Sequence, residues 1–454
     1  MWFDRAYFIG VGGIGMSAIA RWCAMQGVSV AGYDRVESAI TRGLAAVGVA
    51  VHYEDSVEAI PSEFRSDKGG VLVVYTPAIP DDMTELNWFR DNGYVVRKRS
   101  RILGEITKDK FVMAVAGTHG KTTTTSMIAH FNRVVTGGGS AFLGGIAKNF
   151  NSNLVYGEGD RVAVEADEFD RSFLQLYPDV AVVTSADPDH LDIYGTAEAV
   201  REAFEQFIAQ IKPGGTLILK KGVNLRVAEG VKCFSYSVDG EADFCVEDVR
   251  IDECGDYHFT LVTPTEKIKE CHLGVPGWVN VENCVAAAAA LWCAGECDCD
   301  RLRQAMESFS GVKRRLEFYV KQPDRVYFDD YAHHPREIAA AISSVKRIYP
   351  ERHLTAIFQP HLYTRTRDFA EGFAEALSAA DRVILIPIYP AREEPIEGVS
   401  SKLILDGVTA EKYLVEKSEL CDLLGSLESD VVGTFGAGDI ELLCQDVNQV
   451  IANK

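Results

Sequence analysis

Short apolar runs alternate along this chain with segments in which apolar residues recur every three or four positions. A run of about five apolar residues predicts a buried strand, whereas the longer spacing predicts an amphipathic helix. Strands that alternate with helices form parallel sheets, because each crossover helix returns the chain to the same end of the sheet. The pattern predicts an α/β protein built from three such units.

The first unit is predicted from the strands "AYFIG", "VSVAGYD" and "VLVVYTP", with a helix from Met16 to Gln26. The second begins at Phe111 with the strand "FVMAVAG" and the helical segment "KTTTTSMIAHF". Between residues 231 and 275, "CFSYSV", "DFCVEDVRI" and "YHFTLVT" predict an antiparallel insert, and helical patterns follow from Asn280 to about Phe309.

"GVKRRLEFYV" at 311–320 is typical of a hinge into the third unit, in which four apolar strands alternate with helices in a doubly wound pattern. The predicted domains are 1–107, Rossmann-like; 108–310, of P-loop type; and 311–454, doubly wound α/β.

The amino-acid composition mainly serves to exclude classes of function. The chain has 46 basic and 66 acidic residues and a net charge of -20, which argues against nucleic-acid and anionic-membrane binding, because both need a cationic surface. Its eleven scattered cysteines favour reduced thiols over a disulfide framework. The longest apolar run, 285–295, is shorter than the roughly 20 residues of a membrane span. We expect a cytoplasmic protein without membrane insertion.

A glycine-rich turn follows the first predicted strand and opens the first helix. Its residues are Gly10, Gly12, Gly13, Ile14 and Gly15, in G-x-G-x-x-G spacing, and Asp34 ends the next strand. Glycine lets the backbone approach a diphosphate, and the helix N-terminus supplies amide donors. NAD is the usual ligand of such a turn, but the rest of the chain offers no convincing hydride-transfer site. A nucleotide diphosphate or a tight packing turn are the alternatives.

A second loop, "GTHGKT", differs from the usual phosphate loop G-x-x-x-x-G-K-[ST] because only Thr118 and His119 separate its glycines. Its chemistry is still that of a triphosphate site. Backbone amides bind oxygens, Lys121 neutralises phosphate charge, and the Thr122 hydroxyl is a ligand for Mg²⁺.

Acidic residues follow two further strands of the second unit. They are Glu165, Asp167, Glu168 and Asp170 in one segment, and Asp187, Asp189, His190 and Asp192 in the other. Each segment alone is more typical of a solvated loop. Beside a phosphate loop they predict oxygen ligands for a magnesium ion.

Histidine and arginine follow two strands of the third unit: His333, His334, His361, Arg365 and Arg367. A guanidinium suits a carboxylate through its fixed fork of donors. A substrate site is favoured over ordinary polar loops because both strand ends carry these residues.

Six segments in order resemble the motifs of the Mur ligases of peptidoglycan synthesis: "GTHGKTTTT", "EADEFDRSFL", "DPDHLDIYG", "GVKRRLE", "DDYAHHP" and "FQPHLYTRTRDF". The resemblance extends over essentially the whole chain. It implies that the first domain holds a UDP-sugar diphosphate rather than NAD, the second binds ATP, and the third binds an amino acid and completes the ATP site.

The implied reaction joins L-alanine to the lactyl carboxylate of UDP-N-acetylmuramate. ATP first converts the carboxylate to an acyl phosphate, the alanine amine attacks it, and the products are UDP-N-acetylmuramoyl-L-alanine, ADP and phosphate. The implied enzyme is a monomer or homodimer that uses Mg²⁺.

The resemblance also implies a role for each candidate residue. ATP would contact Gly117, Thr118, His119, Gly120, Lys121, Thr122, Thr123, Asn280, Asn283, Arg315 and Asp330. Mg²⁺ would be organised by Thr122, Glu165 and His190. The UDP-sugar would contact Gly10, Gly12, Gly13, Ile14, Gly15 and Asp34. The amino acid would lie near His333, His361 and Arg365, and catalysis would use Lys121, Glu165, His190, His333 and Arg365.

Three positions depart from the family pattern. Val279 stands where a histidine is common, Leu362 where an arginine is common, and Pro77 where a small hydroxyl residue is usual. Three other functions stay open: a recycling ligase of the same family that adds a whole tripeptide, an inactive protein that binds the nucleotide sugar, and a dehydrogenase.

Overall fold

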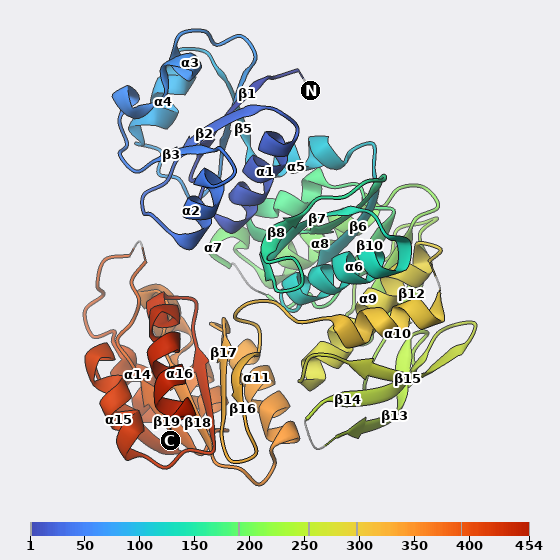
Figure 1. Ribbon diagram of the computed structural model, residues 1–454, viewed down its shortest axis with the longest axis vertical. Helices are drawn as coiled ribbons and strands as arrows, with labels where there is room; N and C mark the ends of the chain where they lie inside the picture. The colour runs from blue at the N-terminus through green and yellow to red at the C-terminus, as the bar shows by residue number, and fades with distance from the viewer. Residues whose placement is uncertain (1, 189–190, 253–254, 297, 392, 454) are drawn as a thin grey trace. The chain divides into compact units, whose positions relative to one another are not determined.

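The computed structural model describes residues 2–188, 191–252, 255–296, 298–391 and 393–453, and Figure 1 labels its elements. The chain divides into two compact units. Unit 1 comprises Met1–Asp248, Phe259–Cys271 and Asn283–Ser310, and unit 2 comprises Val249–His258, His272–Glu282 and Gly311–Lys454. The three domain ranges expected from the sequence stay predictions.

Unit 1 opens with a parallel sheet of strand order β3-β2-β1-β4-β5. Its strands are β1 (Arg5–Ile9), β2 (Ser29–Tyr33), β3 (Ala50–His52), β4 (Val71–Tyr75) and β5 (Val95–Lys98). Alternate residues of β1 enter different cores: Phe8 packs with one cluster, whereas Tyr7 packs with another. Both faces of the sheet are therefore covered, as expected for a Rossmann-like domain.

The helices of this first sheet are α1 (Ile14–Met25), α2 (Ala39–Ala45), α3 (Ser62–Arg65), α4 (Thr84–Asp91) and α5 (Arg99–Thr107). Helix α1 begins two residues earlier than its apolar pattern predicted, directly within the glycine-rich turn. The turn therefore lies at the carboxyl end of β1, where strand order reverses toward β4 and ligands bind in such sheets.

The second sheet of unit 1 has the order β12-β11-β10-β6-β9-β7-β8. Its strands are β6 (Phe111–Ala116), β7 (Ser140–Ala147), β8 (Ser152–Val155), β9 (Arg161–Glu165), β10 (Val180–Val183), β11 (Thr216–Lys220) and β12 (Lys232–Tyr236). All neighbours are parallel except β7 and β8. Strand β12 corrects one prediction: "CFSYSV" extends this parallel sheet instead of opening the antiparallel insert.

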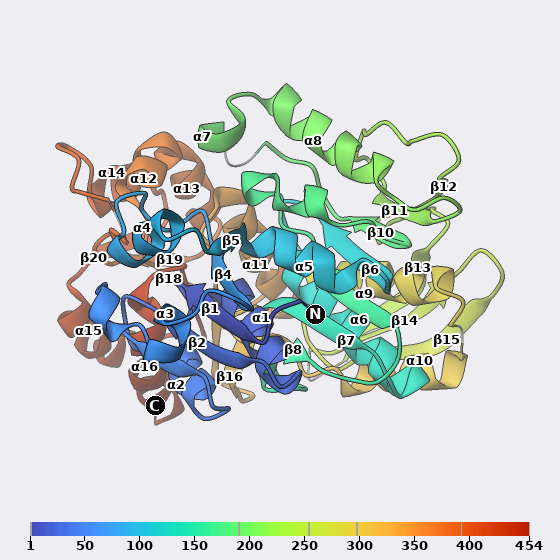
Figure 2. The same cartoon turned by 90° about the horizontal axis from the view of Figure 1, so that it is seen from above.

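Helices cover this sheet as well: α6 (Lys121–Thr136), α7 (Leu191–Tyr194), α8 (Ala197–Ala209), α9 (Trp278–Cys293) and α10 (Cys299–Ser308). Helices α6 and α10 pack against each other (Figures 1 and 2). Phe204 and Phe207 of α8 join the core formed with Val183 and Leu217 of the strands. The predicted helical region from Asn280 to Phe309 is two helices with a break between them.

A three-stranded sheet of order β13-β14-β15 consists of β13 (Cys245–Ile251), β14 (Tyr257–Val262) and β15 (Lys267–Leu273). Its consecutive strands are joined by connections of five and four residues, which only antiparallel neighbours allow. The predicted insert is thus present, but it begins at β13.

Unit 2 contains a six-stranded sheet of order β16-β17-β21-β18-β19-β20. Its strands are β16 (Glu317–Lys321), β17 (Val326–Asp330), β18 (Leu354–Phe358), β19 (Arg382–Leu385), β20 (Glu411–Leu414) and β21 (Val431–Phe435). Only β16 is antiparallel to its neighbour. The helices are α11 (Pro335–Ile348), α12 (Tyr363–Asp368), α13 (Ala370–Leu377), α14 (Ser401–Gly407), α15 (Leu420–Ser426) and α16 (Cys444–Ala452).

Both faces of this sheet are buried, as the continuous apolar strands predicted. Phe328 and Phe358 face one core, while Tyr327 and Ile357 face the other. None of the helices in the described part of the chain combines the length and apolarity needed to cross a bilayer. Nine cysteines lie in that part, and all are free thiols.

Candidate active site

The shortened glycine loop joins β6 to α6 at the carboxyl end of the second sheet, with β10 and β9 on either side. Gly117 has a φ of +136° and Gly120 a φ of +79°, values that favour glycine. A side chain on Gly117 would lie 2.0 Å from Thr184 Oγ1, so the loop keeps this path only with glycine there. The first amides of α6 are thereby placed at the rim of the sheet, as a phosphate site requires.

The two residues between the glycines are tied to the segment after β10. Asp187 N donates to Thr118 Oγ1 over 2.9 Å, and His119 N donates to Ser185 Oγ over 3.0 Å. Thr184 Oγ1 donates in turn to His119 O. These bonds tie the loop to the segment after β10, which reduces the ordering cost of binding.

Lys121 is held in a buried ion pair. Its Nζ lies 2.9 Å from Glu168 and donates to Gly117 O over 2.6 Å. The side chains are 13% and 3% exposed. Burial alone would lower the pKa of Lys121, but the charges of Glu168, Glu165 and Asp167 outweigh it and raise that pKa above its usual value. Lys121 is therefore a fixed positive charge at the loop.

Glu165 ends β9 beside this lysine. Gly144 N donates to Glu165 Oε2 over 3.1 Å, and a side chain on Gly144 would overlap the carboxylate. Thr122, buried at 6% exposure, opens α6. A hydroxyl and a carboxylate are the oxygen ligands that Mg²⁺ prefers, so this donor set fits the ion. The third predicted ligand, His190, lies outside the residues that the structure describes.

Two cations that sequence reasoning missed pair with the same acidic segment. Lys98 Nζ lies 2.7 Å from Asp170 Oδ2, and Arg99 Nη2 lies 3.3 Å from Asp167 Oδ2. A side chain on Gly15 would lie 2.8 Å from Arg99 Nη1, so this arginine also reaches the N-terminal glycine turn. Arg99 thus lies between the acidic segment after β9 and the N-terminal glycine turn. The sequence signal was the basic run "RKRSR" at 97–101, which ends β5 and begins α5.

The N-terminal turn is closed by Asp34. Gly12 N donates to Asp34 Oδ2 over 2.7 Å, and a side chain on Gly12 would lie 2.8 Å from the same oxygen. Gly10 has a φ of +83°. Asp34 shapes the turn through its bond to Gly12. Contact with the sugar itself stays a prediction.

In unit 2, the predicted histidines and arginine follow β17 and β18, two strands that both pair with β21. The His333 and His361 rings lie 6.3 Å apart, edge to face. Burial lowers the pKa of His333, Glu337 opposes this, and the charge of Arg365 lowers it further. These three residues therefore share one rim of the sheet. Asp368 pairs with Arg367 at 2.7 Å.

Asp330 is fixed by the backbone around it. Leu316 N and Ala332 N donate to its two oxygens over 2.7 and 2.8 Å. Burial raises its pKa to about 6, although Arg315 and these bonds oppose the shift. Arg314 and Arg315 both lie over the Tyr331 ring, at 5.3 and 5.2 Å, and Arg314 also pairs with Asp329.

The two predicted adenine contacts lie on one face of α9, three residues apart. Asn280 donates to Pro276 O over 2.7 Å, and Thr124 Oγ1 donates to Asn283 Oδ1 over 3.1 Å. A side chain on Gly120 would lie 2.8 Å from Asn283 Oδ1. Asn283 therefore borders the glycine loop of unit 1, and the role of each asparagine toward adenine stays a prediction.

A cavity of about 530 Å³ opens beside the loop at the ends of β10 and β11. Thr184, Ser185 and Asp187 line one side, and Lys220 and Lys221 another. Its cations make it a suitable recess for an anionic group next to the phosphate loop.

Three family models match the chain in order. They are the Mur ligase family catalytic domain over residues 5–111, the Mur ligase middle domain over 115–291, and the Mur ligase glutamate ligase domain over 314–438. Together they cover most of the sequence, and each contains one of the sheets that carry the candidate residues.

Curated relatives cover almost the full length. The chain is 51% identical over 452 residues to UDP-N-acetylmuramate–L-alanine ligase of Parabacteroides distasonis, covering 99% of this chain and 97% of that protein. The same enzyme of Porphyromonas gingivalis is 49% identical, with 98% and 99% covered.

Solved structures share the fold. The UDP-N-acetylmuramate–alanine ligase of Thermotoga maritima superposes with a TM-score of 0.82 at 28% identity, covering 99% of this chain and 100% of that chain. A murein peptide ligase of Psychrobacter arcticus superposes with a TM-score of 0.70 at 21% identity, with 99% of both chains covered, and so supports the fold alone.

Proposed function

Because the chain belongs to the Mur ligase family, we propose that it ligates L-alanine to the lactyl carboxylate of UDP-N-acetylmuramate at the expense of ATP. The observation that carries this is 51% identity over 99% of the chain to an enzyme of that name. The reaction belongs to peptidoglycan precursor synthesis, and we assign it to the cytoplasm, where ATP is available.

ATP is the phosphoryl donor. The amides of the Gly117–Thr123 loop and the ammonium of Lys121 hold its phosphates and neutralise charge on the group being transferred. The lactyl carboxylate oxygen attacks the terminal phosphorus, ADP leaves, and an acyl phosphate forms. Because little covalent chemistry falls to the protein, positioning and charge stabilisation supply most of the acceleration.

Thr122 and Glu165 would hold Mg²⁺, which would neutralise phosphate charge when bound. Glu165 is oriented by the hydrogen bond from Gly144 N.

The amino acid then attacks the acyl carbon. His333 is suited to take the proton that the amine must lose. Its Nδ1 lies 3.2 Å from Tyr331 O, a carbonyl that only accepts, so Nδ1 carries the proton and Nε2 keeps a lone pair. Burial lowers the pKa of this histidine, so it is neutral near pH 7. Phosphate leaves as the tetrahedral intermediate collapses, and Arg365 would pair with the alanine carboxylate.

An ADP-release assay with purified protein tests the proposal. We expect release that requires both UDP-N-acetylmuramate and L-alanine, with the alanylated product identified by mass spectrometry. Hydroxylamine added in place of alanine should trap the acyl phosphate as a hydroxamate. Lys121→Ala should abolish all of these signals but retain UDP-sugar binding, because the Gly117–Thr123 loop and the Gly10–Gly15 turn belong to different sheets.

The tripeptide-recycling reaction is the nearest competitor, since it uses the same nucleotide sugar. Turnover with the tripeptide but not with L-alanine would overturn the proposed amino-acid substrate. Tight NAD binding without UDP-sugar binding would overturn the ligand proposed for the Gly10–Gly15 turn.

A further inference from the structure

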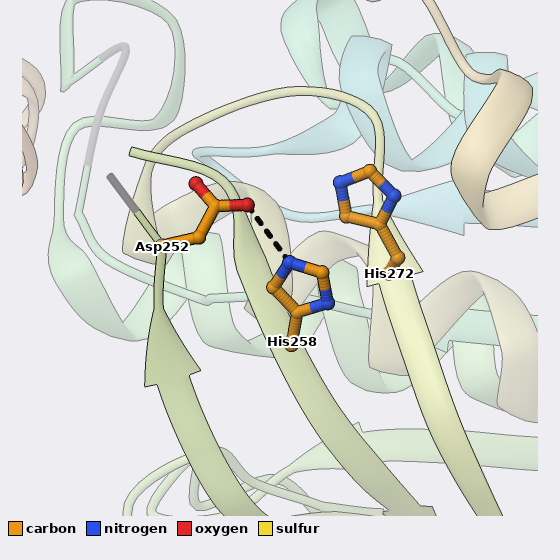
Figure 3. A group of neighbouring side chains, drawn as sticks. All are labelled: Asp252, His258 and His272. Atoms are coloured by element: carbon orange, nitrogen blue, oxygen red, sulfur yellow. Dashed lines mark hydrogen bonds and ion pairs between the residues drawn. The ribbon is translucent and has the colours of Figure 1, made fainter. Parts of the chain in front are cut away.

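Two histidines and an aspartate converge at one end of the β13-β14-β15 sheet, and the proposed reaction uses none of them. Asp252 follows β13, His258 lies in β14 and His272 lies in β15. Their nearest ligand atoms all lie within 4.8 Å of one another. Figure 3 shows the three side chains pointing toward a common space, with Asp252 bonded to His258.

Strand periodicity explains why the histidines meet. In β14, Tyr257 and Phe259 are buried and His258 between them is half-buried; in β15, Cys271 and Leu273 are buried around half-buried His272. Alternate residues face opposite sides of a sheet, so both histidines lie on its more open face. Their rings stack at 4.5 Å with an interplanar angle of 9°.

Asp252 is oriented by the turn that precedes β14. Asp256 N donates to Asp252 Oδ1 over 3.0 Å, and Gly255 N donates to Asp252 O over 2.9 Å. The other carboxylate oxygen, Oδ2, lies 2.9 Å from His258 Nε2. A carboxylate fixed in this way has one oxygen committed to the backbone and the other aimed at the histidines, as in metal sites whose ligands are held by outer hydrogen bonds.

We propose that Asp252, His258 and His272 form a site for a first-row divalent transition metal, represented by Zn²⁺. Two imidazole nitrogens and one carboxylate oxygen form a common zinc donor set, with water at the fourth position. The 21% exposure of the His258 side chain and 33% of Asp252 leave the site open to an ion from solution.

The geometry requires one imidazole to rotate, because two rings stacked at an interplanar angle of 9° cannot both direct their in-plane lone pairs at one ion. Ligand atoms around a tetrahedral Zn²⁺ with bonds of about 2.0–2.1 Å lie roughly 3.3 Å from one another. The Asp252–His258 pair, at 2.9 Å, opens slightly, and His272 moves in from within 4.8 Å. On binding, His258 coordinates through Nε2 and carries its proton on Nδ1. Each donor comes from a different segment of the sheet, so the ion ties the turn at residue 252 to β14 and β15.

Zn²⁺ is favoured over Mg²⁺ because imidazole suits transition metals, while Mg²⁺ prefers oxygen ligands. The site is therefore chemically distinct from the one proposed at Thr122 and Glu165. It is structural or regulatory, because it includes none of the groups assigned to ATP, sugar or alanine.

Metal titration of the full-length protein tests this site. The protein is stripped with a chelator and titrated with Co²⁺ without nucleotide, following visible absorption, and Zn²⁺ is then used to displace Co²⁺. We expect one equivalent bound with the absorption of a four- or five-coordinate ion. Asp252→Asn, His258→Gln and His272→Gln should each weaken binding by at least about tenfold, on the scale of ligand-support losses.

His353→Gln is the matched control, because His353 is a half-buried histidine of unit 2 outside the cluster. It should bind Co²⁺ like the parent protein. Zn²⁺ should also raise the Tm of the parent and of the control but not of the three ligand variants, since only the folded state holds the site. Circular dichroism without metal verifies that each variant is folded.

Unchanged Co²⁺ affinity in all three ligand variants would overturn the proposal. So would binding that disappears in His333→Gln alone, which would place the ion at the histidines of the other rim. Mg²⁺-supported ligation should persist in His258→Gln without Zn²⁺, so failure of this site leaves the proposed reaction untouched.

Discussion

Glu168→Gln is expected to destabilise the protein without ATP and to strengthen ATP binding. The substitution removes the charge that pairs with Lys121 at 2.9 Å, where the two side chains are 13% and 3% exposed. Removing one partner of a buried pair costs about 3–5 kcal/mol, because the other charge stays buried without compensation. Glu165 and Asp167 still attract Lys121, and Gly117 O still accepts from it, so we expect the lower limit, about 3 kcal/mol.

ATP changes this balance because its phosphates offer Lys121 another anionic partner. If Lys121 leaves Glu168 when ATP binds, the variant is destabilised in the free state only. A difference of about 3 kcal/mol corresponds to roughly a hundredfold in Kd, so a tenfold or greater gain in ATP affinity is expected. Urea unfolding with and without saturating Mg²⁺–ATP, together with calorimetric titration of ATP, measures both quantities.

Asp170→Asn is the control from the same segment. Its partner Lys98 is 45% exposed, so the loss should stay below about 1 kcal/mol and should not depend on ATP. An equal loss of stability in Glu168→Gln with and without ATP would show that Lys121 keeps Glu168 in the bound state, and would refute the exchange of partners.

Three further predictions follow from the described contacts. Arg365→Ala should raise the KM for L-alanine far more than the KM for ATP, and Arg365→Lys should rescue this effect only in part. Arg367→Ala is the control and should change neither KM, because Arg367 pairs with Asp368. Equal changes in the two KM values would exclude a role for Arg365 in binding the alanine carboxylate. Glu165→Ala should raise the Mg²⁺ concentration for half-maximal ligation or abolish turnover, and an unchanged metal titration would contradict its role as a ligand. Burial lowers the pKa of His130 from 6.5 to about 4, so the unfolded chain binds a proton at a higher pH than the folded protein does. The free energy of unfolding should therefore fall by up to about 3 kcal/mol as the pH drops from 6.5 to 4. Urea unfolding of His130→Gln should lack this loss, and the same pH dependence in the variant would argue against a role for His130.

The sheets could be predicted because apolar periodicity reports local structure directly. Both predicted phosphate turns follow strands, and the rule that parallel strands place their carboxyl ends together was sufficient to locate the acidic segment near Lys121. The assignment of "CFSYSV" to the insert was wrong because an isolated apolar run does not specify which sheet it joins. Strand β12 pairs with β11, and that partner depends on the return path of the chain.

Individual ion pairs could not be predicted in this way. Lys121 and Glu168 are 47 positions apart, and Arg99 and Asp167 are 68 apart. Four carboxylates lie within six residues in the segment 165–170, and composition does not indicate which cation each one meets. The backbone decides this: Asp170 and Arg171 adopt left-handed φ values of 52° and 54°, which reorient the segment after Glu168. The cluster of Asp252, His258 and His272 was missed for a similar reason. The turns between β13, β14 and β15 bring the three residues together, and their spacing in the sequence does not show that they meet.

The cations paired with the acidic segment explain how a chain with a net charge of -20 can bind anionic substrates. Lys98, Arg99 and Lys121 provide positive charge in unit 1, and each is paired with a carboxylate of Asp170, Asp167 or Glu168. An incoming phosphate or carboxylate that binds one of these cations would therefore replace an existing partner instead of meeting an isolated cation. Such exchange keeps buried cations compensated before the substrate arrives, at the cost of part of the binding energy. The cost is largest for Lys121, the most buried of the three, so the ATP loop is where removing a carboxylate should increase affinity most.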